Sequence, residues 1–133
     1  MALGRPTFQS STAFSGVSSR AVDGNTSGVW NNGSITHTNN SNGAWWRVDL
    51  DITTSIDQII VFNRTDSCCA SRLSDFYVEV LNESGRVTGS LYVRSLSESS
   101  LTINANGTQA KSVRIRLAGT NVLSLAEVQV IKE

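Results

Sequence analysis

The chain has 133 residues, the size of a single domain, and its formal net charge is zero. A neutral chain without a basic run is not expected to bind nucleic acid or an anionic membrane through its charge. No apolar stretch approaches the ~20 residues that a membrane-spanning helix needs. The first residues lack the charged start and apolar centre of a signal peptide. We therefore expect either a cytoplasmic chain or a mature or excised domain, with residues 1–133 forming one unit.

The first third of the chain is mostly polar. A first strand is expected over residues 7–12. A tight turn is expected over residues 20–26, because Asp-Gly-Asn favours left-handed backbone and side-chain-to-backbone hydrogen bonds. A long loop follows over residues 26–44, and its few non-polar or titratable residues include Trp30 and the single histidine, His37. A loop of this length in a compact domain is usually functional or mobile.

The rest of the chain alternates between apolar and polar residues with period two, which is typical of half-buried strands. No segment longer than a turn has helical periodicity. Short strands separated by turn signals indicate an antiparallel β-sandwich or barrel, and thus an all-β fold. The expected strands span residues 45–51, 56–62, 75–81, 91–93, 101–103, 112–117 and 126–131.

Residues 63–72 concentrate two arginines, one aspartate and both cysteines directly after the expected central strand. Each arginine presents a rigid, always charged fork of donors. On a turn, Asp66 can lie between Arg64 and Arg72 and hold both. Such a site suits a ligand rich in oxygen lone pairs. The alternative is a solvated surface ion pair, worth ~0–1 kcal/mol.

Cys68 and Cys69 are adjacent, so each can pair with its neighbour, stay free or bond another chain. A bond between neighbours closes no loop and gains no stability from chain entropy. It would form a small, stiff, apolar plate on the loop, whereas the alternative is two reduced thiols in a turn. A zinc site is not expected, because only His37 could add another soft ligand.

Glu127 interrupts an otherwise apolar final strand. The pattern alone favours an outward-facing glutamate on an edge. The alternative is a carboxylate that reaches a cation together with oxygens of Asp23, Asn25 and Ser34 in the early loop. Hard cations such as calcium take six to eight oxygen ligands of mixed type. Binding there would fix the long loop to the final strand.

Four segments of the chain resemble discoidin-type, galactose-binding-like domains: residues 9–12, 20–25, 46–50 and 126–130. Within that group the chain resembles the F-type lectins, or fucolectins. Their motif is a histidine, twenty-six residues, Arg-x-Asp, four residues and then an arginine or lysine. His37, Arg64 and Asp66 match this spacing. Arg72 follows after five residues, as if Ser67 were inserted. The resemblance covers nearly the whole chain and implies a jelly-roll β-sandwich.

The resemblance implies a lectin that reversibly binds terminal α-L-fucose on glycans. In this family the histidine and both arginines donate hydrogen bonds to the ring oxygen and hydroxyls of the sugar, roles that fall on His37, Arg64 and Arg72. Asp66 is then implied to orient the arginines. The implied partners are fucosylated glycans, with several sites supplied by an oligomer or a multidomain parent.

The resemblance also implies a vicinal disulfide between Cys68 and Cys69 that packs on the sugar ring. An apolar wall receives the C6 methyl group in this family. Trp30 is the candidate by its place in the loop before the histidine, and its alternative role is to anchor that loop.

A structural calcium ion is implied as well. In this family it is held by loop oxygens and a late glutamate. Carried over, the ligands are the backbone carbonyl of Arg20 with Asp23, Asn25, Ser34 and Glu127. The resemblance further implies an extracellular or cell-surface location.

An enzyme is not expected, because the chain has one histidine and Asp66 between two arginines should stay ionised, which suits a general acid poorly. Two other functions remain open. One is a discoidin-type module that binds a protein or phospholipid surface through apolar loop tips. The other is a carbohydrate-binding module of a larger glycosidase.

Overall fold

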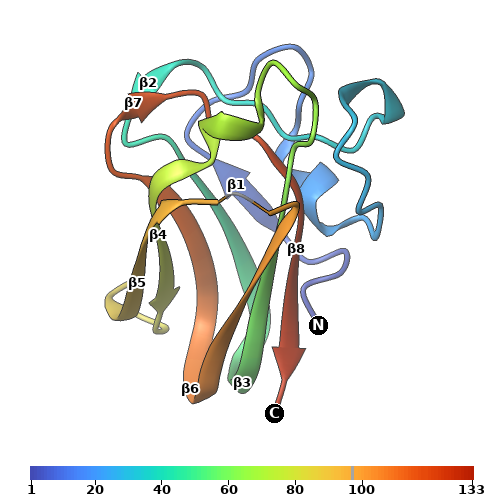
Figure 1. Ribbon diagram of the computed structural model, residues 1–133. Helices are drawn as coiled ribbons and strands as arrows, with labels where there is room; N and C mark the ends of the chain where they lie inside the picture. The colour runs from blue at the N-terminus through green and yellow to red at the C-terminus, as the bar shows by residue number, and fades with distance from the viewer. Residues whose placement is uncertain (97) are drawn as a thin grey trace.

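Two long strands organise the computed structural model, which describes residues 1–96 and 98–133 (Figure 1). They are β3 (Trp45–Asn63) and β6 (Ser100–Leu117), of 19 and 18 residues. The shorter described strands are β1 (Thr7–Gln9), β2 (Ser41–Asn42), β4 (Ser74–Leu81), β5 (Val87–Ser95), β7 (Thr120–Asn121) and β8 (Leu125–Lys132). Three short 3₁₀ helices complete the described secondary structure: η1 (Ser18–Val22), η2 (Trp30–Asn32) and η3 (Ala70–Arg72).

The two long strands pair with each other along both of their halves. β1 pairs with the first half of β3, where Thr7 lies opposite Val48, and β4 pairs with the second half of β6. β8 pairs with the second half of β3, where Ile59 lies opposite Val130. One layer therefore contains β1, β4 and β5, the other contains β8, and the long strands run through both. This is an antiparallel β-sandwich, the all-β fold that the alternation predicted.

The two layers share one core cluster. Trp46, Phe76, Ile59 and Ile115 are at most 1% exposed. The indole N–H of Trp46 donates to the carbonyl of Ser18 at 3.0 Å, so this large ring is buried without an unpaired polar group. The predicted alternation correctly gave the inward faces of β4, β8, the first half of β3 and the second half of β6.

Several predicted strand boundaries were wrong. Residues 45–51 and 56–62 belong to one strand, β3, and residues 101–103 and 112–117 belong to β6. The register of the β3–β6 ladder shifts between Asp49 and Thr54, which lets a single strand bend instead of ending. Conversely, β1 ends at Gln9, short of the predicted strand.

The long loop before β3 and the loop between β3 and β4 lie together at one end of the sandwich, opposite to the C-terminus (Figure 1). The long loop over residues 26–44 is fixed there by the start of β8. The amide of Thr36 donates to the carbonyl of Leu125 at 2.9 Å, and the amide of Leu125 donates to Thr36 Oγ1 at 3.0 Å. His37 is therefore held on an anchored, buried segment. No helix in the described residues is both long and apolar enough to cross a membrane.

Candidate functional site

His37 sits where two loops cross. Its amide donates to the carbonyl of Gly16 at 2.9 Å, and its carbonyl accepts from the amide of Ala13 at 2.9 Å. A Cβ atom at Gly16 would lie 2.6 Å from the Cβ of His37, so the close approach requires glycine. The backbone position of His37 is thus fixed from both sides.

The imidazole of His37 is 7% exposed and has a defined tautomer. Nδ1 lies 2.8 Å from the carbonyl oxygen of Thr38, which can only accept, so Nδ1 carries the hydrogen. Burial lowers the pKa of His37, and the nearby charges of Arg72 and Arg64 lower it further, although the bond to Thr38 opposes this shift. The neutral ring leaves Nε2 as an acceptor facing the pocket. This differs from the predicted donor role of His37.

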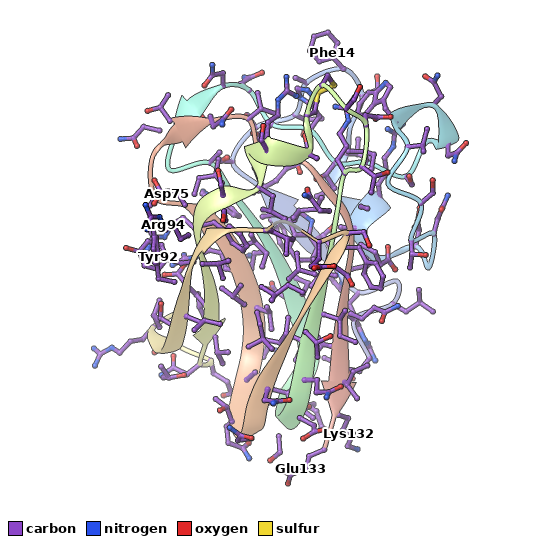
Figure 2. The ribbon with its side chains drawn as sticks, in the orientation of Figure 1. Phe14, Asp75, Tyr92, Arg94, Lys132 and Glu133 are labelled. Atoms are coloured by element: carbon purple, nitrogen blue, oxygen red, sulfur yellow. A yellow bond between two sulfur atoms is a disulfide. The ribbon has the colours of Figure 1, made fainter. Side chains whose placement is uncertain are left out.

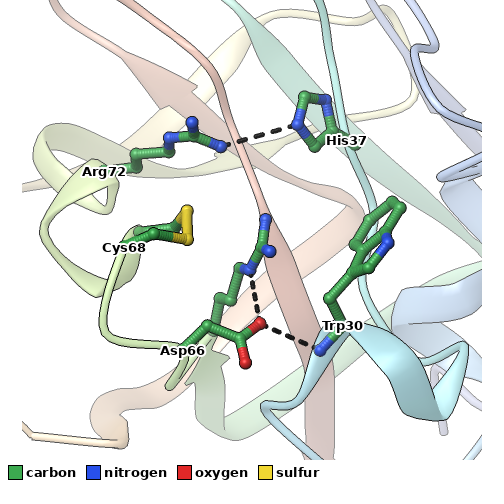
Figure 3. The surroundings of a disulfide bond; sticks show 7 residues. Trp30, His37, Asp66, Cys68 and Arg72 are labelled. Atoms are coloured by element: carbon green, nitrogen blue, oxygen red, sulfur yellow. Dashed lines mark hydrogen bonds and ion pairs between the residues drawn. A yellow bond between two sulfur atoms is a disulfide. The ribbon is translucent and has the colours of Figure 1, made fainter.

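Arg64 and Trp30 are held together by Asp66 (Figure 3). Oδ2 of Asp66 accepts from Arg64 Nε at 2.8 Å and from the backbone N–H of Trp30 at 2.9 Å. The hydrogen bond from Arg64 contributes most to lowering the pKa of Asp66, so the carboxylate stays ionised. The Arg64 guanidinium also lies 5.1 Å from the centre of the Trp30 ring. Nε of Arg64 is engaged in the ion pair, and the Arg64 residue lines the pocket described below.

Arg72 closes the other side of the site at the end of η3. Its Nη1 donates to Nε2 of His37 at 3.5 Å. Among the described residues Asp66 accepts from Arg64 and not from Arg72, so it does not hold both arginines as predicted. The extra residue Ser67 is exposed on the loop and does not prevent Arg72 from reaching His37.

Cys68 and Cys69 are joined by a disulfide on the loop between the two arginines. Cys69 is 4% exposed and lines the pocket, whereas Cys68 faces solvent. The amide of Cys69 donates to the carbonyl of Asp66 at 3.0 Å, and the carbonyl of Cys69 accepts from the amide of Arg72 at 3.1 Å. The disulfide therefore lies within the same turn that carries Asp66 and Arg72.

These side chains surround a pocket of about 240 Å³ at the loop end of the sandwich. It is lined by Phe14, Trp30, His37, Arg64, Cys69 and Arg72. Five of these six were predicted from the sequence, and Phe14 was not. The ring of Trp30 meets that of His37 edge-on at 5.6 Å, so Trp30 is both a pocket wall and a support of the loop. The pocket thus combines two cationic donor forks, one acceptor and an apolar surface.

Phe14 stands at the tip of the loop end (Figure 2). It is 79% exposed, and its ring contacts His37 edge-on at 5.0 Å. Both Phe14 and Ser15 have left-handed backbone, with φ of 53° and 60°. Non-glycine residues in this region are strained, and such strain concentrates at binding sites. The loop that carries Phe14 is fixed by Gln9, whose Nε2 donates to the carbonyl of Gly16 at 2.9 Å.

Glu127 is 2% exposed, so the predicted outward-facing edge position was wrong. Its Oε2 accepts from the amide of Gly24 at 2.8 Å, whereas Oε1 is buried without a partner among the described residues. Burial raises the pKa of Glu127 to about 7, and the nearby charge of Asp23 contributes, although the bond from Gly24 opposes this shift. One oxygen of an ionisable side chain is therefore buried without a hydrogen-bond partner among the described residues.

The other predicted calcium ligands lie along the loop that reaches Glu127. Arg20 is in η1, one turn before Asp23. Oδ1 of Asn25 accepts from the amide of Ser27 at 3.1 Å, and Ser34 Oγ donates to the carbonyl of Ser27 at 2.5 Å. The described residues contain no group of three or more His, Cys, Asp or Glu side chains able to hold a metal. Any cation site here must therefore use carbonyl and amide oxygens beside the carboxylate.

Comparison with known families decides the classification. The sequence profile of the NedA-like, galactose-binding domain of the F5/F8 type C group matches residues 20–115. The chain belongs to this family. Fucolectin-1 of Anguilla japonica is 34% identical over 116 residues, covering 83% of this chain and 65% of that protein. Fucolectin-4 of the same species is 45% identical over 56 residues, which is 42% of this chain and 30% of that protein. The galactose-binding-like chain thus spans less than two thirds of these relatives.

Several solved structures have the same fold and align with almost the whole of this chain. The lectin domain of lectinolysin, solved with the Lewis B antigen, has a TM-score of 0.97 and 38% identity, with 99% of this chain and 95% of that chain covered. A Streptococcus pneumoniae fucose binding module, SpX-3, has a TM-score of 0.96 and 38% identity, with 99% and 96% covered. The fucolectin of Morone saxatilis serum has a TM-score of 0.85 and 28% identity, with 96% and 45% covered.

Proposed function

We propose that this galactose-binding-like domain is a lectin domain that reversibly binds terminal α-L-fucose on glycans. The observation that carries the proposal is the convergence of His37, Arg64 and Arg72 on one pocket beside Cys69 and Trp30. His37 and Arg64 match the spacing of the fucolectin motif and Arg72 follows one residue later than the motif has it. Relatives of similar sequence are named fucolectins and fucose binding modules. The pocket offers donors, an acceptor and an apolar surface, which suit a neutral polyol.

Recognition follows from the polarity of the three side chains. The arginine forks donate to sugar oxygens, and neutral His37 accepts from a sugar hydroxyl through Nε2. One hydroxyl, such as the axial 4-hydroxyl, can accept from an arginine and donate to His37 at the same time. A sugar without that hydroxyl leaves a desolvated group unpaired, at a cost of ~1–3 kcal/mol.

The apolar part of the pocket fits the apolar face of the sugar. Cys69 and Trp30 line the pocket together with Arg64, so they supply its apolar surface beside a cationic donor. The C6 methyl of fucose would contribute about 0.8 kcal/mol on burial against Trp30. A small ligand in a shallow site is expected to bind with a Kd between about micromolar and millimolar. Useful avidity would then come from several sites, in an oligomer or a multidomain parent at the cell surface or outside the cell.

The first test is retention on immobilised L-fucose. The oxidised domain should be retained. Free L-fucose should elute it at a much lower concentration than D-galactose does. Flow-through on the fucose resin, with retention on resins that carry other sugars, would show that the ligand is not fucose.

Binding should depend on pH through His37. A protonated ring would lose its acceptor and place a third positive charge beside Arg64 and Arg72. Because the folded-state pKa of His37 lies below its ordinary value of 6.5, the acceptor is present above that pH and is lost only as the pH falls further. Calorimetric titrations in saturating calcium should give a constant fucose Kd from pH 8 to about 6.5 and weaker binding below. Weakening that begins above pH 7 would contradict the neutral-acceptor role.

Reduction of Cys68–Cys69 should weaken fucose binding, because the turn that carries Arg72 would lose its covalent constraint. The Tm should change little, since the bond closes no loop between distant residues. Titration before and after treatment with a dithiol tests this, with a Cys68→Ser, Cys69→Ser double variant as the reference for the open form. Two free thiols measured in fully active protein would contradict the role of the disulfide.

The proposal includes a structural calcium ion at Glu127. The support is the unpartnered, buried Oε1, because a cation would supply the missing partner of a desolvated carboxylate. Oxygens of Asp23, Asn25 and Ser34, with the carbonyl of Arg20, would complete a set of the mixed type that calcium prefers. When bound, calcium would neutralise the carboxylate charge and fix the early loop to β8.

A further inference from the structure

The side chain of Arg20 contacts one wall of the sugar pocket without lining the pocket itself. Its guanidinium carbon lies 5.5 Å from the centre of the Trp30 ring, within the range of a cation–π contact. Trp30 is one of the six residues that line the pocket, and Arg20 is not. Arg20 is therefore not placed to donate to a bound sugar, and any effect that it has on binding must be exerted through a residue of the pocket.

The backbone of Arg20 is fixed to the core of the sandwich. Arg20 is in the last turn of η1, and the next two residues, Ala21 and Val22, are 0% and 2% exposed. The carbonyl of Ser18 in the same helix accepts from the buried indole N–H of Trp46 at 3.0 Å. The Arg20 side chain thus starts from a point that does not depend on the pocket loops.

The guanidinium of Arg20 is fixed as well. Its Nη1 donates at 3.2 Å to the carbonyl of Ile35, a residue that is 0% exposed. In the part of the chain that the structure describes, the carboxylates that form ion pairs lie beside other arginines and not beside Arg20. Because both ends of the side chain are held, its charged group presents a fixed surface to the Trp30 ring.

The Trp30 ring needs such a support. Trp30 begins η2, a helix of three residues of which none is buried. Its ring meets the ring of His37 edge-on at 5.6 Å and lies 5.1 Å from the Arg64 guanidinium. Both of these neighbours line the pocket. Arg20 is the neighbour that joins the ring to the core from outside the pocket.

We propose that Arg20 is a positioning residue, which fixes the Trp30 ring as the wall for the C6 methyl group and so sets the preference for a 6-deoxy sugar. The inference rests on the proposed function. Burial of one methyl group against a fixed wall should increase the affinity about fourfold. A ring that can move loses this gain, whereas the hydroxyl contacts of the other pocket residues remain.

The test compares L-fucose with D-arabinose, whose pyranose form has the same arrangement of hydroxyls and lacks the C6 methyl group. Calorimetric titrations of the oxidised domain in saturating calcium give both Kd values for the wild type and for Arg20→Ala. The wild type should prefer L-fucose about fourfold. Arg20→Ala should bring the ratio of the two Kd values close to one, and the Kd of D-arabinose should change by less than about twofold.

Three other results would overturn the proposal. A merely structural role of Arg20 would weaken both sugars by the same factor and keep the ratio. Unchanged Kd values in Arg20→Ala would show that the ring needs no support from this residue. Equal affinities of the wild type for the two sugars would leave no methyl preference to explain, although the sugar site would stand. If the wild type binds neither sugar, the proposed function itself fails.

Arg47→Ala is the matched control. Arg47 also faces an aromatic ring, with its guanidinium carbon 4.6 Å from the centre of the Phe8 ring, and it does not line the pocket. Its removal should keep the wild-type ratio. In Trp30→Ala protein, the further change Arg20→Ala should alter neither Kd, because Arg20 acts through that ring. A change there would overturn the route through Trp30.

Arg20→Lys replaces Arg20→Ala if the alanine variant does not fold. Lysine keeps the charge and a donor for the Ile35 carbonyl, but it has no planar group to face the indole ring. A ratio below that of the wild type is expected, and the wild-type ratio in folded Arg20→Lys would then overturn the proposal.

Discussion

Arg72→Ala is expected to abolish detectable fucose binding while leaving the Tm nearly unchanged. Arg72 forms one side of the pocket, and within residues 1–96 and 98–133 its side chain bonds to His37 at 3.5 Å. Hydrogen bonds from a charged donor are worth ~1.5–3 kcal/mol each. Loss of two of them would weaken binding by roughly 100-fold or more. From a starting Kd between micromolar and millimolar, little or no heat should remain in a calorimetric titration.

Arg86→Ala is the matched control, because Arg86 is an exposed arginine in the turn between β4 and β5. It removes the same charge and should bind fucose as the wild type does. Thermal unfolding of all three proteins should give similar Tm values, since Arg72 contributes no core packing. Undiminished binding by Arg72→Ala would remove this residue from the site and leave the pocket unexplained as a fucose site.

Calcium is expected to stabilise the domain, with a gain that increases with pH. At a concentration 100 times its Kd, a ligand adds ~2.7 kcal/mol, on the order of 8 °C in Tm for a domain of this size. Without calcium the stability of the domain should instead fall as the pH rises. The folded state raises the pKa of Glu127 to about 7, above its ordinary value of 4.5, and so binds the proton more tightly than the unfolded chain. Its contribution to stability is therefore complete below pH 4.5 and lost as the pH rises towards 7.

Glu127→Gln isolates this effect, because the amide keeps an acceptor for Gly24 and cannot ionise. Thermal unfolding is measured from pH 5 to 8 for both proteins, in calcium and in chelator. The Tm of the wild type relative to the variant should fall with pH in chelator, and the stabilisation that calcium adds to the wild type should increase with pH. Parallel curves in the two conditions would show that Glu127 binds no cation.

The alternation of apolar residues was enough to predict the β-sandwich and the inward face of most strands. It failed where one strand continued through a bend, because the exposed residues around Ile52 break the alternation as a turn would. It also failed at Glu127. Leu125 to Val128 are all buried, since the early loop covers the face of β8 that simple alternation assigns to solvent.

The fucolectin motif located His37, Arg64, Arg72 and the cysteine pair, which the structure brings to one pocket. Phe14 was missed because a single aromatic residue in a polar loop carries no periodic signal. Gly16 and Gly28 were missed for a different reason. Each is required by a close approach to a segment far away in the sequence, and local composition does not reveal such contacts.

The central claim is that this pocket binds L-fucose. Its most direct test is a calorimetric titration of the oxidised, calcium-saturated domain with L-fucose, with D-galactose as the comparison. We expect a saturable signal with a Kd at or below about millimolar for L-fucose and much weaker binding of D-galactose. No heat with either sugar at millimolar concentration, from protein whose disulfide and fold are intact, would contradict the proposed function.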